Sequence, residues 1–341
     1  MNIKELMKNL DVIAQAKLVP FIQGSPGIGK SDAVRSIADK YKLKLIDIRL
    51  SQCDPTDLNG LPKFIDNRAT FVPFDTFPLE DTPVPEGYNG WLIFLDEINA
   101  ASKGLQAVAY KLILDRMVGQ HKLHKNCIMM CAGNKETDNA VVNTISTALR
   151  SRFITLPLEP DTDAWLEWSE KQNIDFRIIA YIRMKQMSGL YDFDPDYTDT
   201  AYACPRSWHM LSKLLAKIPK GKESEYENLV EGTIGRQASM FTNFCKYALN
   251  IPSIESILSG KAQLNMTLDL GMRYVLASYV IAHADKIEND TQAKHVTEFL
   301  DQLGKEFTIP FYNSAYTKNP KIMNFPAISS KAKEYAIWLR E

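Results

Sequence analysis

The stretch "GSPGIGKS" at residues 24–31 matches the pattern G-x-x-x-x-G-K-[ST], with Gly24, Gly29, Lys30 and Ser31 at the fixed positions. Loops of this kind wrap their backbone N–H groups around the phosphates of a nucleotide, and the N-terminus of the next helix adds a favourable partial charge. The lysine reaches the β- and γ-phosphates, and the serine hydroxyl binds Mg²⁺. The other loop residues expected to bind the nucleotide are Ser25, Pro26, Gly27 and Ile28. We call residues 24–31 the phosphate loop.

Two carboxylates, Asp96 and Glu97, directly follow the apolar run "WLIFL" at residues 91–95. The carboxyl end of a buried strand points into the ligand crevice of an open α/β sheet. We therefore expect Asp96 to hold Mg²⁺ together with Ser31, directly or through water, and Glu97 to polarise an attacking water. An acidic pair can also mark a helix N-terminus. The apolar strand and the complete phosphate loop favour the catalytic interpretation.

A further polar residue, Asn134, ends the apolar run in "CAGNKETD". Its amide could position the water beside the γ-phosphate, although a strand-end Asn is often only a turn residue. The same stretch is close to N-K-x-D, the pattern that specifies guanine. However, the position three after Asn134 is Thr137, and the aspartate comes one later, at Asp138. The pattern is not met, so we expect ATP.

Three arginines lie near predicted element ends. Arg150 and Arg152 in "ALRSRF" precede a predicted strand, and each could either pair with local carboxylates or reach the γ-phosphate of a neighbouring subunit. Arg206 in "PRSW" falls in the first turn of a predicted helix, a position from which it could touch the nucleotide. Pro at a helix start is by itself only a capping signal.

The elements around these residues alternate between short apolar runs and amphipathic stretches, which is an α/β pattern. Unbroken apolar runs are typical of a parallel sheet covered on both faces. Pro20 removes a hydrogen-bond donor from the first run, so we expect that strand to start at Phe21. The expected strands are residues 18–23, 43–50, 91–95, 127–133 and 153–158. The expected helix at 102–119 buries Leu105, Val108, Ala109, Leu112, Ile113 and Met117 on one face.

From residue 159 onward the pattern is helical throughout. A chain of 341 residues exceeds what one hydrophobic core usually holds, roughly 250–300 residues. We therefore predict an α/β nucleotide-binding domain at 1–158, a helical lid at 159–250 and a helical extension at 251–341. The extension carries no motif that indicates a function.

Composition narrows the class of protein. The chain has 40 Lys and Arg against 41 Asp and Glu, and it has no basic block of the kind that binds nucleic acid. No apolar run approaches the roughly 18 residues that cross a bilayer, and the start has no signal peptide, so we expect a cytoplasmic location. The five cysteines form no C-x-x-C pair, which indicates reduced thiols. His121 and His124 lack nearby ligand partners, so no transition metal is expected.

The ordered series "GSPGIGKS", "LSQCDPTDLNGLP", "FLDEINAA", "CAGN", "ALRSRF" and "CPRSW" resembles the MoxR-like AAA+ ATPases over roughly residues 15–220. The resemblance implies a five-stranded sheet of order 5-1-4-3-2, a helical lid, and a ring, commonly a hexamer, with ATP between subunits. It also implies that Asn134 is sensor 1, Arg152 the arginine finger and Arg206 sensor 2. Arg150 has no fixed counterpart in the family.

Two stretches have the pattern of β-hairpins: residues 61–74 around a "DNRA" turn, and residues 116–126 around a Gly. In the family they resemble the helix-2 insert and the pre-sensor-1 hairpin. Both would then face the pore or the client. Surface hairpins without a function remain the alternative.

These observations predict an ATP-hydrolysing ring motor or chaperone that remodels a protein partner. Members of the family often work with a von Willebrand A-domain protein. This chain has no D-x-S-x-S motif, so such a partner would be a separate polypeptide. One alternative is a DNA-acting helicase loader or restriction-type motor, which the near-neutral charge disfavours. Another is a nucleotide-gated assembly factor, which Glu97 and Arg152 together disfavour.

Overall fold

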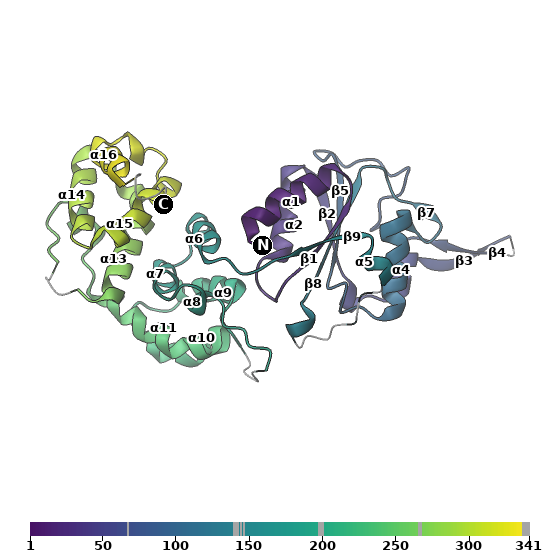
Figure 1. The fold of residues 1–341 in the computed structure, drawn as a ribbon, viewed down its shortest axis with the longest axis horizontal. Coiled ribbons are helices and arrows are strands. Elements are labelled where there is room, and N and C mark those ends of the chain that lie inside the picture. Colours follow the sequence, from purple (N-terminus) through teal and green to yellow (C-terminus); the bar gives the residue numbers. More distant parts are fainter. Residues whose placement is uncertain are drawn as a thin grey trace. The chain divides into compact units, whose positions relative to one another are not determined.

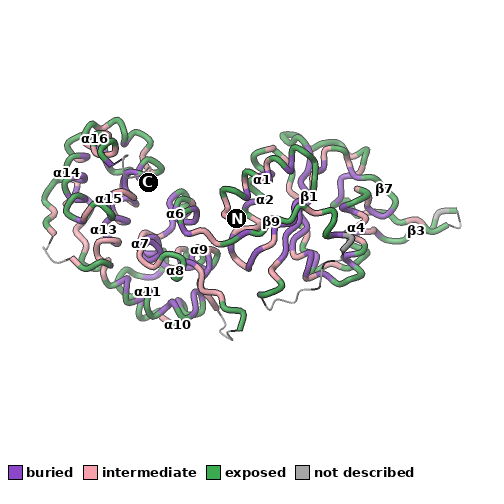
Figure 2. Tube along the Cα trace, viewed as in Figure 1, coloured by how far each residue is buried: buried purple, intermediate pink, exposed green. Residues whose placement is uncertain are grey.

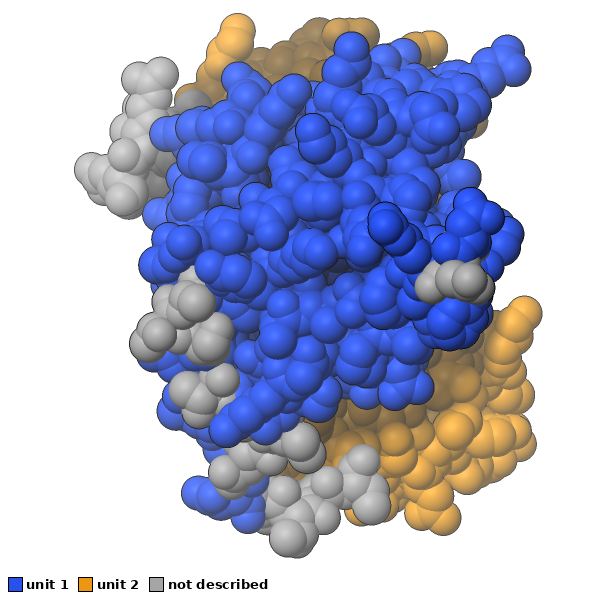
Figure 3. Space-filling view, turned by 90° about the vertical axis from the view of Figure 1, so that its right-hand side faces the viewer, with its two compact units in different colours: residues 1–160, 194–197 blue, residues 161–193, 198–341 orange. Residues whose placement is uncertain are grey.

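The computed structural model describes residues 1–66, 68–138, 143, 145, 147–196, 201–264 and 268–335. Two compact units make up the chain (Figure 3). Unit 1 contains residues 1–160 with 194–197, and unit 2 contains residues 161–193 and 198–341. The division of the helical part at residue 250 stays a prediction, and residues 336–341 of the predicted extension lie outside the described residues.

Unit 1 is built on a five-stranded parallel sheet with the order β2-β5-β8-β1-β9. The strands are β1 (Val19–Gln23), β2 (Leu43–Arg49), β5 (Gly90–Asp96), β8 (Cys127–Gly133) and β9 (Phe153–Pro157). Counting only these five along the chain and reading from the β9 edge, the order is 5-1-4-3-2. The predicted sheet order is therefore confirmed.

Helices cover both faces of this sheet (Figure 1). On one side lie α1 (Ile3–Gln15) and α2 (Lys30–Lys40), and on the other lie α4 (Lys103–Asp115) and α5 (Thr147–Arg150). Alternate residues of β5 point to opposite faces of the sheet. Because helices cover both faces, every residue of that strand is buried. Ile93 and Leu95, for example, pack in one cluster with Leu105 of α4.

Two local expectations were wrong. β1 begins at Val19 rather than Phe21, because Pro20 is paired only with Ile154 of β9, and pairing with β8 starts one residue later. The missing N–H of the proline therefore falls where the strand has a single neighbour. The helix α4 ends at Asp115, since Arg116 adopts a left-handed conformation with φ 54°. Met117 consequently belongs to a strand and not to the apolar face of the helix.

Both predicted hairpins are confirmed. β3 (Leu61–Ile65) pairs with β4 (Arg68–Val72), following the short helix α3 (Pro55–Asn59); residue 67 at the predicted turn lies outside the described residues. β6 (Met117–Val118) pairs with β7 (His121–Lys122).

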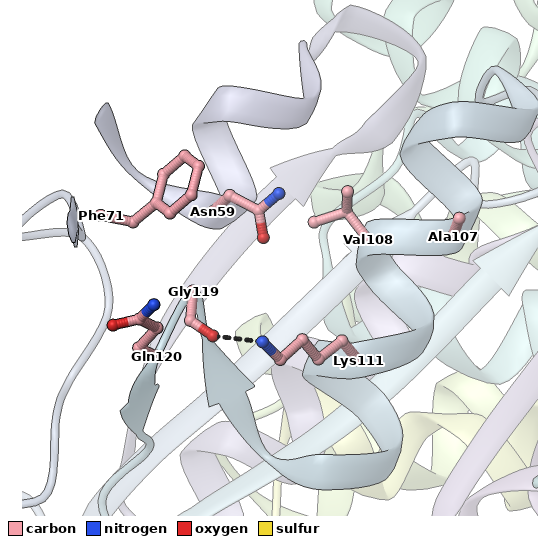
Figure 4. A pocket seen from close by; sticks show the side chains of 7 residues that line it. All are labelled: Asn59, Phe71, Ala107, Val108, Lys111, Gly119 and Gln120. Atoms are coloured by element: carbon pink, nitrogen blue, oxygen red, sulfur yellow. Dashed lines mark hydrogen bonds between the residues drawn. The ribbon is translucent and has the colours of Figure 1, made fainter. Parts of the chain in front are cut away.

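The two hairpins touch each other beside α4. The imidazole Nε2 of His121 lies 3.1 Å from the Phe71 carbonyl oxygen. At Gly119, whose φ is 57°, an added Cβ would lie 2.6 Å from the Asn59 carbonyl oxygen, so the turn requires glycine. Lys111 of α4 donates to the Gly119 carbonyl at 2.6 Å. A cavity of about 350 Å³ remains between α3, β4, α4 and the β6–β7 turn (Figure 4).

Unit 2 is helical, and buried residues alternate with exposed ones along its helices (Figure 2). One apolar cluster surrounds Tyr181, Trp208 and Phe241. A second cluster occupies the C-terminal helices, and α13 contributes to both. The helices are α6 (Thr162–Lys171), α7 (Phe176–Lys185), α8 (Met187–Leu190), α9 (Pro205–Leu215), α10 (Glu227–Ile234), α11 (Ala238–Cys245), α12 (Ile254–Leu258), α13 (Leu270–Ala282), α14 (Asp290–Asp301), α15 (Lys305–Lys318) and α16 (Pro326–Tyr335). No helix in the described ranges is long and apolar enough to cross a bilayer.

A buried ion pair ties four of these helices together. Arg183 of α7 donates to the Glu170 carboxylate of α6, to Ser278 of α13 at 3.2 Å and to Ser314 of α15 at 3.4 Å. Both charged side chains are less than 10% exposed, at 8% and 4%. Burial raises the pKa of the Glu170 carboxyl, and the Arg183 charge opposes that rise. The pair therefore joins the predicted lid to the predicted extension within unit 2.

Replacing Arg183 with Ala should lower the free energy of unfolding by about 3–5 kcal/mol, because Glu170 is left buried without its counter-charge. Urea denaturation followed by circular dichroism measures the loss. The matched control is Lys294→Ala, which removes an exposed pair with Glu298 and should cost at most about 1 kcal/mol. Equal losses in the two variants would show that the buried pair stabilises the fold no more than an exposed pair does.

Candidate nucleotide site

The phosphate loop connects β1 to α2, and two of its glycines are required for different reasons. At Gly24 an added Cβ would lie 2.8 Å from the Leu158 carbonyl oxygen and 2.7 Å from Ile28 Cδ1, so no side chain fits. Gly29 caps α2 with φ 97°, a left-handed conformation that other residues adopt at a cost. Ser25 and Ile28 are buried, and Pro26 and Gly27 are half-buried. Gly24 and Gly29 thus allow a backbone path that larger side chains would obstruct or strain.

Lys30 lies at the first position of α2 and turns its ammonium back over the loop. Its Nζ donates to the carbonyl oxygens of Gly24 at 2.5 Å and Ser25 at 3.0 Å. The same group donates to Oδ1 of Asn134 at 3.0 Å. β1 and β8 are neighbours in the sheet, so their carboxyl ends bring Lys30 and Asn134 together.

Ser31 and Asp96 meet at the same edge of the sheet. The Ser31 hydroxyl donates to Oδ2 of Asp96 at 3.2 Å, and the backbone N–H of Glu97 donates to Oδ1 at 2.9 Å. Burial raises the pKa of the Asp96 carboxyl, whereas these two hydrogen bonds and the Lys30 charge oppose the rise. A hydroxyl beside a carboxylate is the oxygen donor set that Mg²⁺ prefers, so the residues fit the ion.

Glu97 stands next to this pair in a left-handed conformation, with φ 57°. Such a conformation in a non-glycine residue costs on the order of 1–3 kcal/mol and is concentrated at functional sites. The Glu97 carboxylate accepts a hydrogen bond from the hydroxyl of Ser51, which follows β2. Sequence reasoning missed Ser51. No signal in the sequence marks it, because only the folded sheet pairs Arg49, the last residue of that strand, with Asp96.

Two further residues that sequence reasoning missed hold the end of β8. The buried Asp138 accepts hydrogen bonds from the Ser25 hydroxyl and from the Lys135 backbone N–H, both at 3.2 Å. Asp138, which lies one position too late to meet the guanine pattern, is therefore hydrogen-bonded to the phosphate loop. The side chain of Asn99 bonds to the backbone of Asn134.

The three predicted arginines differ in their surroundings. Arg150 pairs with Glu136 at 3.5 Å on the surface. Arg152 is exposed, donates to the Ser151 hydroxyl at 2.5 Å, and holds its guanidinium 5.8 Å from the centre of the Tyr110 ring. Arg152 forms no ion pair with any residue that the structure describes. Arg206 belongs to unit 2, where it is exposed in the first turn of α9.

Comparison with known proteins gives a family match over part of the chain. Residues 21–157 match the model of the "ATPase family associated with various cellular activities (AAA)". Among curated proteins, none matches the chain.

Three solved structures with a matching fold are distant from this chain in sequence. A mutant of Thermotoga maritima RuvB is 16% identical over 75% of this chain and 74% of its own, with a TM-score of 0.40. The Thermotoga maritima "RuvB Holliday junction branch migration motor" has the same identity and coverage and a TM-score of 0.38. A putative ATPase from Cytophaga hutchinsonii is 12% identical over 97% of this chain and 88% of its own, with a TM-score of 0.37. The assignment rests on the family match together with the sheet order. Residues 21–157, which are less than half of the chain, therefore match the AAA ATPase family, and this match supports ATP hydrolysis by the chain.

Proposed function

We propose that this chain is a ring-forming, ATP-driven motor or chaperone of the MoxR type that remodels a protein partner. The observation that carries the proposal is the position of Arg152: it is exposed on the domain and forms no ion pair within the described ranges. An arginine supplied from outside a site can stabilise the charge on the transferred phosphoryl group. An exposed arginine without an ion pair to any described residue therefore supports a site completed by a neighbouring subunit. The ordered motifs support the same family, in which hexamers are common.

Each residue at the sheet edge has a role in this proposal. Lys30 neutralises charge on the β- and γ-phosphates. Glu97 polarises the attacking water, and Asn134 holds that water in position. Ser31 and Asp96 would hold Mg²⁺, which neutralises phosphate charge when bound. Hydrogen bonds of 2.9–3.2 Å join Lys30 to Asn134, Ser31 to Asp96, and the Glu97 backbone N–H to Asp96. These bonds support one shared site.

The arginines divide between subunits and domains. Arg152 acts as the finger on the nucleotide of the next subunit. Arg206 acts as the lid contact to the nucleotide of its own subunit. Arg150 pairs with Glu136 on the surface, and the proposal gives it no role in the site.

The hairpins are the proposed surface for the client. The β3–β4 hairpin and the residues that follow it expose large apolar side chains, among them Phe64, which is 78% exposed. Apolar side chains on the surface of a protein that acts on other proteins support a binding role. The other exposed apolar residues are Leu61, Phe71, Val72 and Phe74. The proposal includes a cytoplasmic location and a separate client or von Willebrand A-domain protein.

Lys30→Ala should abolish measurable ATP binding, because the loop loses the one side chain that reaches the β- and γ-phosphates. Equilibrium binding of a fluorescent ATP analogue measures the effect. Lys111→Ala is the matched control, since that ammonium also donates to a backbone carbonyl but lies at the hairpins. If ATP affinity in Lys30→Ala stays within a few-fold of wild type, the loop does not bind nucleotide as proposed.

A DNA-acting motor is the alternative to the protein-remodelling proposal. It would appear as ATP turnover stimulated by DNA, together with salt-sensitive DNA binding by the assembled ring. A protein-remodelling ring should give neither result.

A further inference from the structure

Asn99 lies three residues after Asp96 and is 2% exposed. Its side-chain amide makes two hydrogen bonds with the backbone of Asn134. Nδ2 donates to the Asn134 carbonyl oxygen at 2.7 Å, and Oδ1 accepts from the Asn134 N–H at 3.2 Å. A buried amide with both ends paired to a single residue is strongly constrained in orientation.

This amide continues the pairing of β5 with β8 beyond the end of the strands. The regular register ends at Leu95 and Cys131, and the next bond runs from the Ile98 N–H to the Ala132 carbonyl at 3.1 Å. Between these bonds the chain turns away at Glu97, where φ is 57°. A side-chain amide carries the same donor and acceptor as a peptide group. Asn99 therefore bonds to Asn134 as the next residue of a neighbouring strand would.

The residue before Asn134 leaves room for this arrangement. An added Cβ at Gly133 would lie 2.3 Å from Oδ1 of Asn99, so a side chain there would displace the amide. The Gly133 carbonyl accepts the N–H of Gly24 at 3.2 Å. The end of β8 is thus held between the phosphate loop on one side and Asn99 on the other.

We propose that Asn99 is a positioning residue, which fixes the Asn134 amide relative to Glu97 and thereby sets the rate of ATP hydrolysis. The inference rests on the proposed role of Asn134. Asn99 itself touches neither the nucleotide nor the water. It acts by tying the backbone of Asn134 to the turn that carries Glu97, and the Asn134 side chain leads from that backbone to Lys30.

Asn99→Leu conserves the branched shape of the side chain and removes both hydrogen bonds. The variant should lose about 10- to 10²-fold in kcat, because small displacements of a positioning group cost rates of this order. Its KM for ATP should stay within about three-fold, since the phosphate loop is intact. Asn99→Ser, which is smaller and still polar, provides a second variant if the leucine variant does not fold.

Gln106→Met is the matched control. The Gln106 amide is also buried, and it donates to the Ala101 carbonyl of the same turn at 3.2 Å, without a bond to β8. Its replacement should leave kcat within about two-fold of wild type. An equal fall of kcat in both variants would mean that loosening of the turn, rather than loss of the Asn99 bonds, slows the enzyme, and would overturn the inference.

The decisive measurement combines Asn99→Leu with Asn134→Ala in steady-state ATP hydrolysis. If Asn99 acts through the Asn134 side chain, Asn99→Leu should cost at most about two-fold further in the Asn134→Ala background. A full additional loss in that background would show that Asn99 acts independently, and would overturn the inference while leaving the role of Asn134 intact. Wild-type turnover in Asn134→Ala alone would instead remove the proposed role of Asn134, and the inference with it.

Discussion

Arg152→Ala is expected to reduce ATP turnover by about 10³–10⁵-fold, the range found where an arginine supplied in trans is removed. Folding and ATP binding should be unchanged, because Arg152 is exposed and its described contacts are Ser151 and the Tyr110 ring. The physical reason is that the guanidinium would stabilise charge on the phosphoryl group only in the transition state. Single-turnover hydrolysis and equilibrium ATP binding separate the two effects.

Arg150→Ala provides the matched control for this variant. Arg150 is also exposed and lies two positions away, but it pairs with Glu136 at 3.5 Å. Its loss should change turnover by no more than about two-fold, as expected for an exposed ion pair. A comparable loss in both variants would indicate a general disturbance of the segment before β9.

Glu97→Gln should lower the rate of hydrolysis by about 10²–10⁴-fold while ATP and Mg²⁺ still bind. The amide keeps the size of the side chain and can still meet the Ser51 hydroxyl, but it cannot take a proton from water. Rapid-mix hydrolysis and nucleotide binding measure the outcome. Glu136→Gln, an exposed carboxylate in the same unit, is the control. Loss of ATP binding in Glu97→Gln would make Glu97 a ligand or a structural residue instead of a base.

Much of the sheet could be predicted because its strands are unbroken apolar runs, which is the pattern of strands buried on both faces. The errors occurred where the folded structure departs from what a local sequence rule predicts. Pro20 is tolerated because β8 does not pair there, and the helix α4 stops at Arg116 without a glycine or proline to signal it. Neither fact can be read from residue types, since each depends on a neighbouring element or on a single backbone conformation.

Some residues of the site could likewise be predicted from the sequence, and others could not. The phosphate loop and the Asp96–Glu97 pair could be predicted because their residues are contiguous and their spacing is dictated by the nucleotide. Ser51, Asn99 and Asp138 could not, because their partners are 46, 35 and 113 residues away along the chain. These three residues hold the chemical groups in place, and only the fold brings them to the groups that they hold.

The central claim, that a neighbouring subunit completes the active site, is tested most directly by mixing two inactive variants. Arg152→Ala subunits keep an intact phosphate loop, and Lys30→Ala subunits keep an intact finger. Mixed rings, with subunit exchange verified by light scattering and labelled subunits, should therefore hydrolyse ATP although neither parent does so appreciably. Activity should recover in proportion to the number of mixed interfaces. A wild-type chain that is monomeric and fully active as an ATPase would contradict a site completed by a neighbouring subunit.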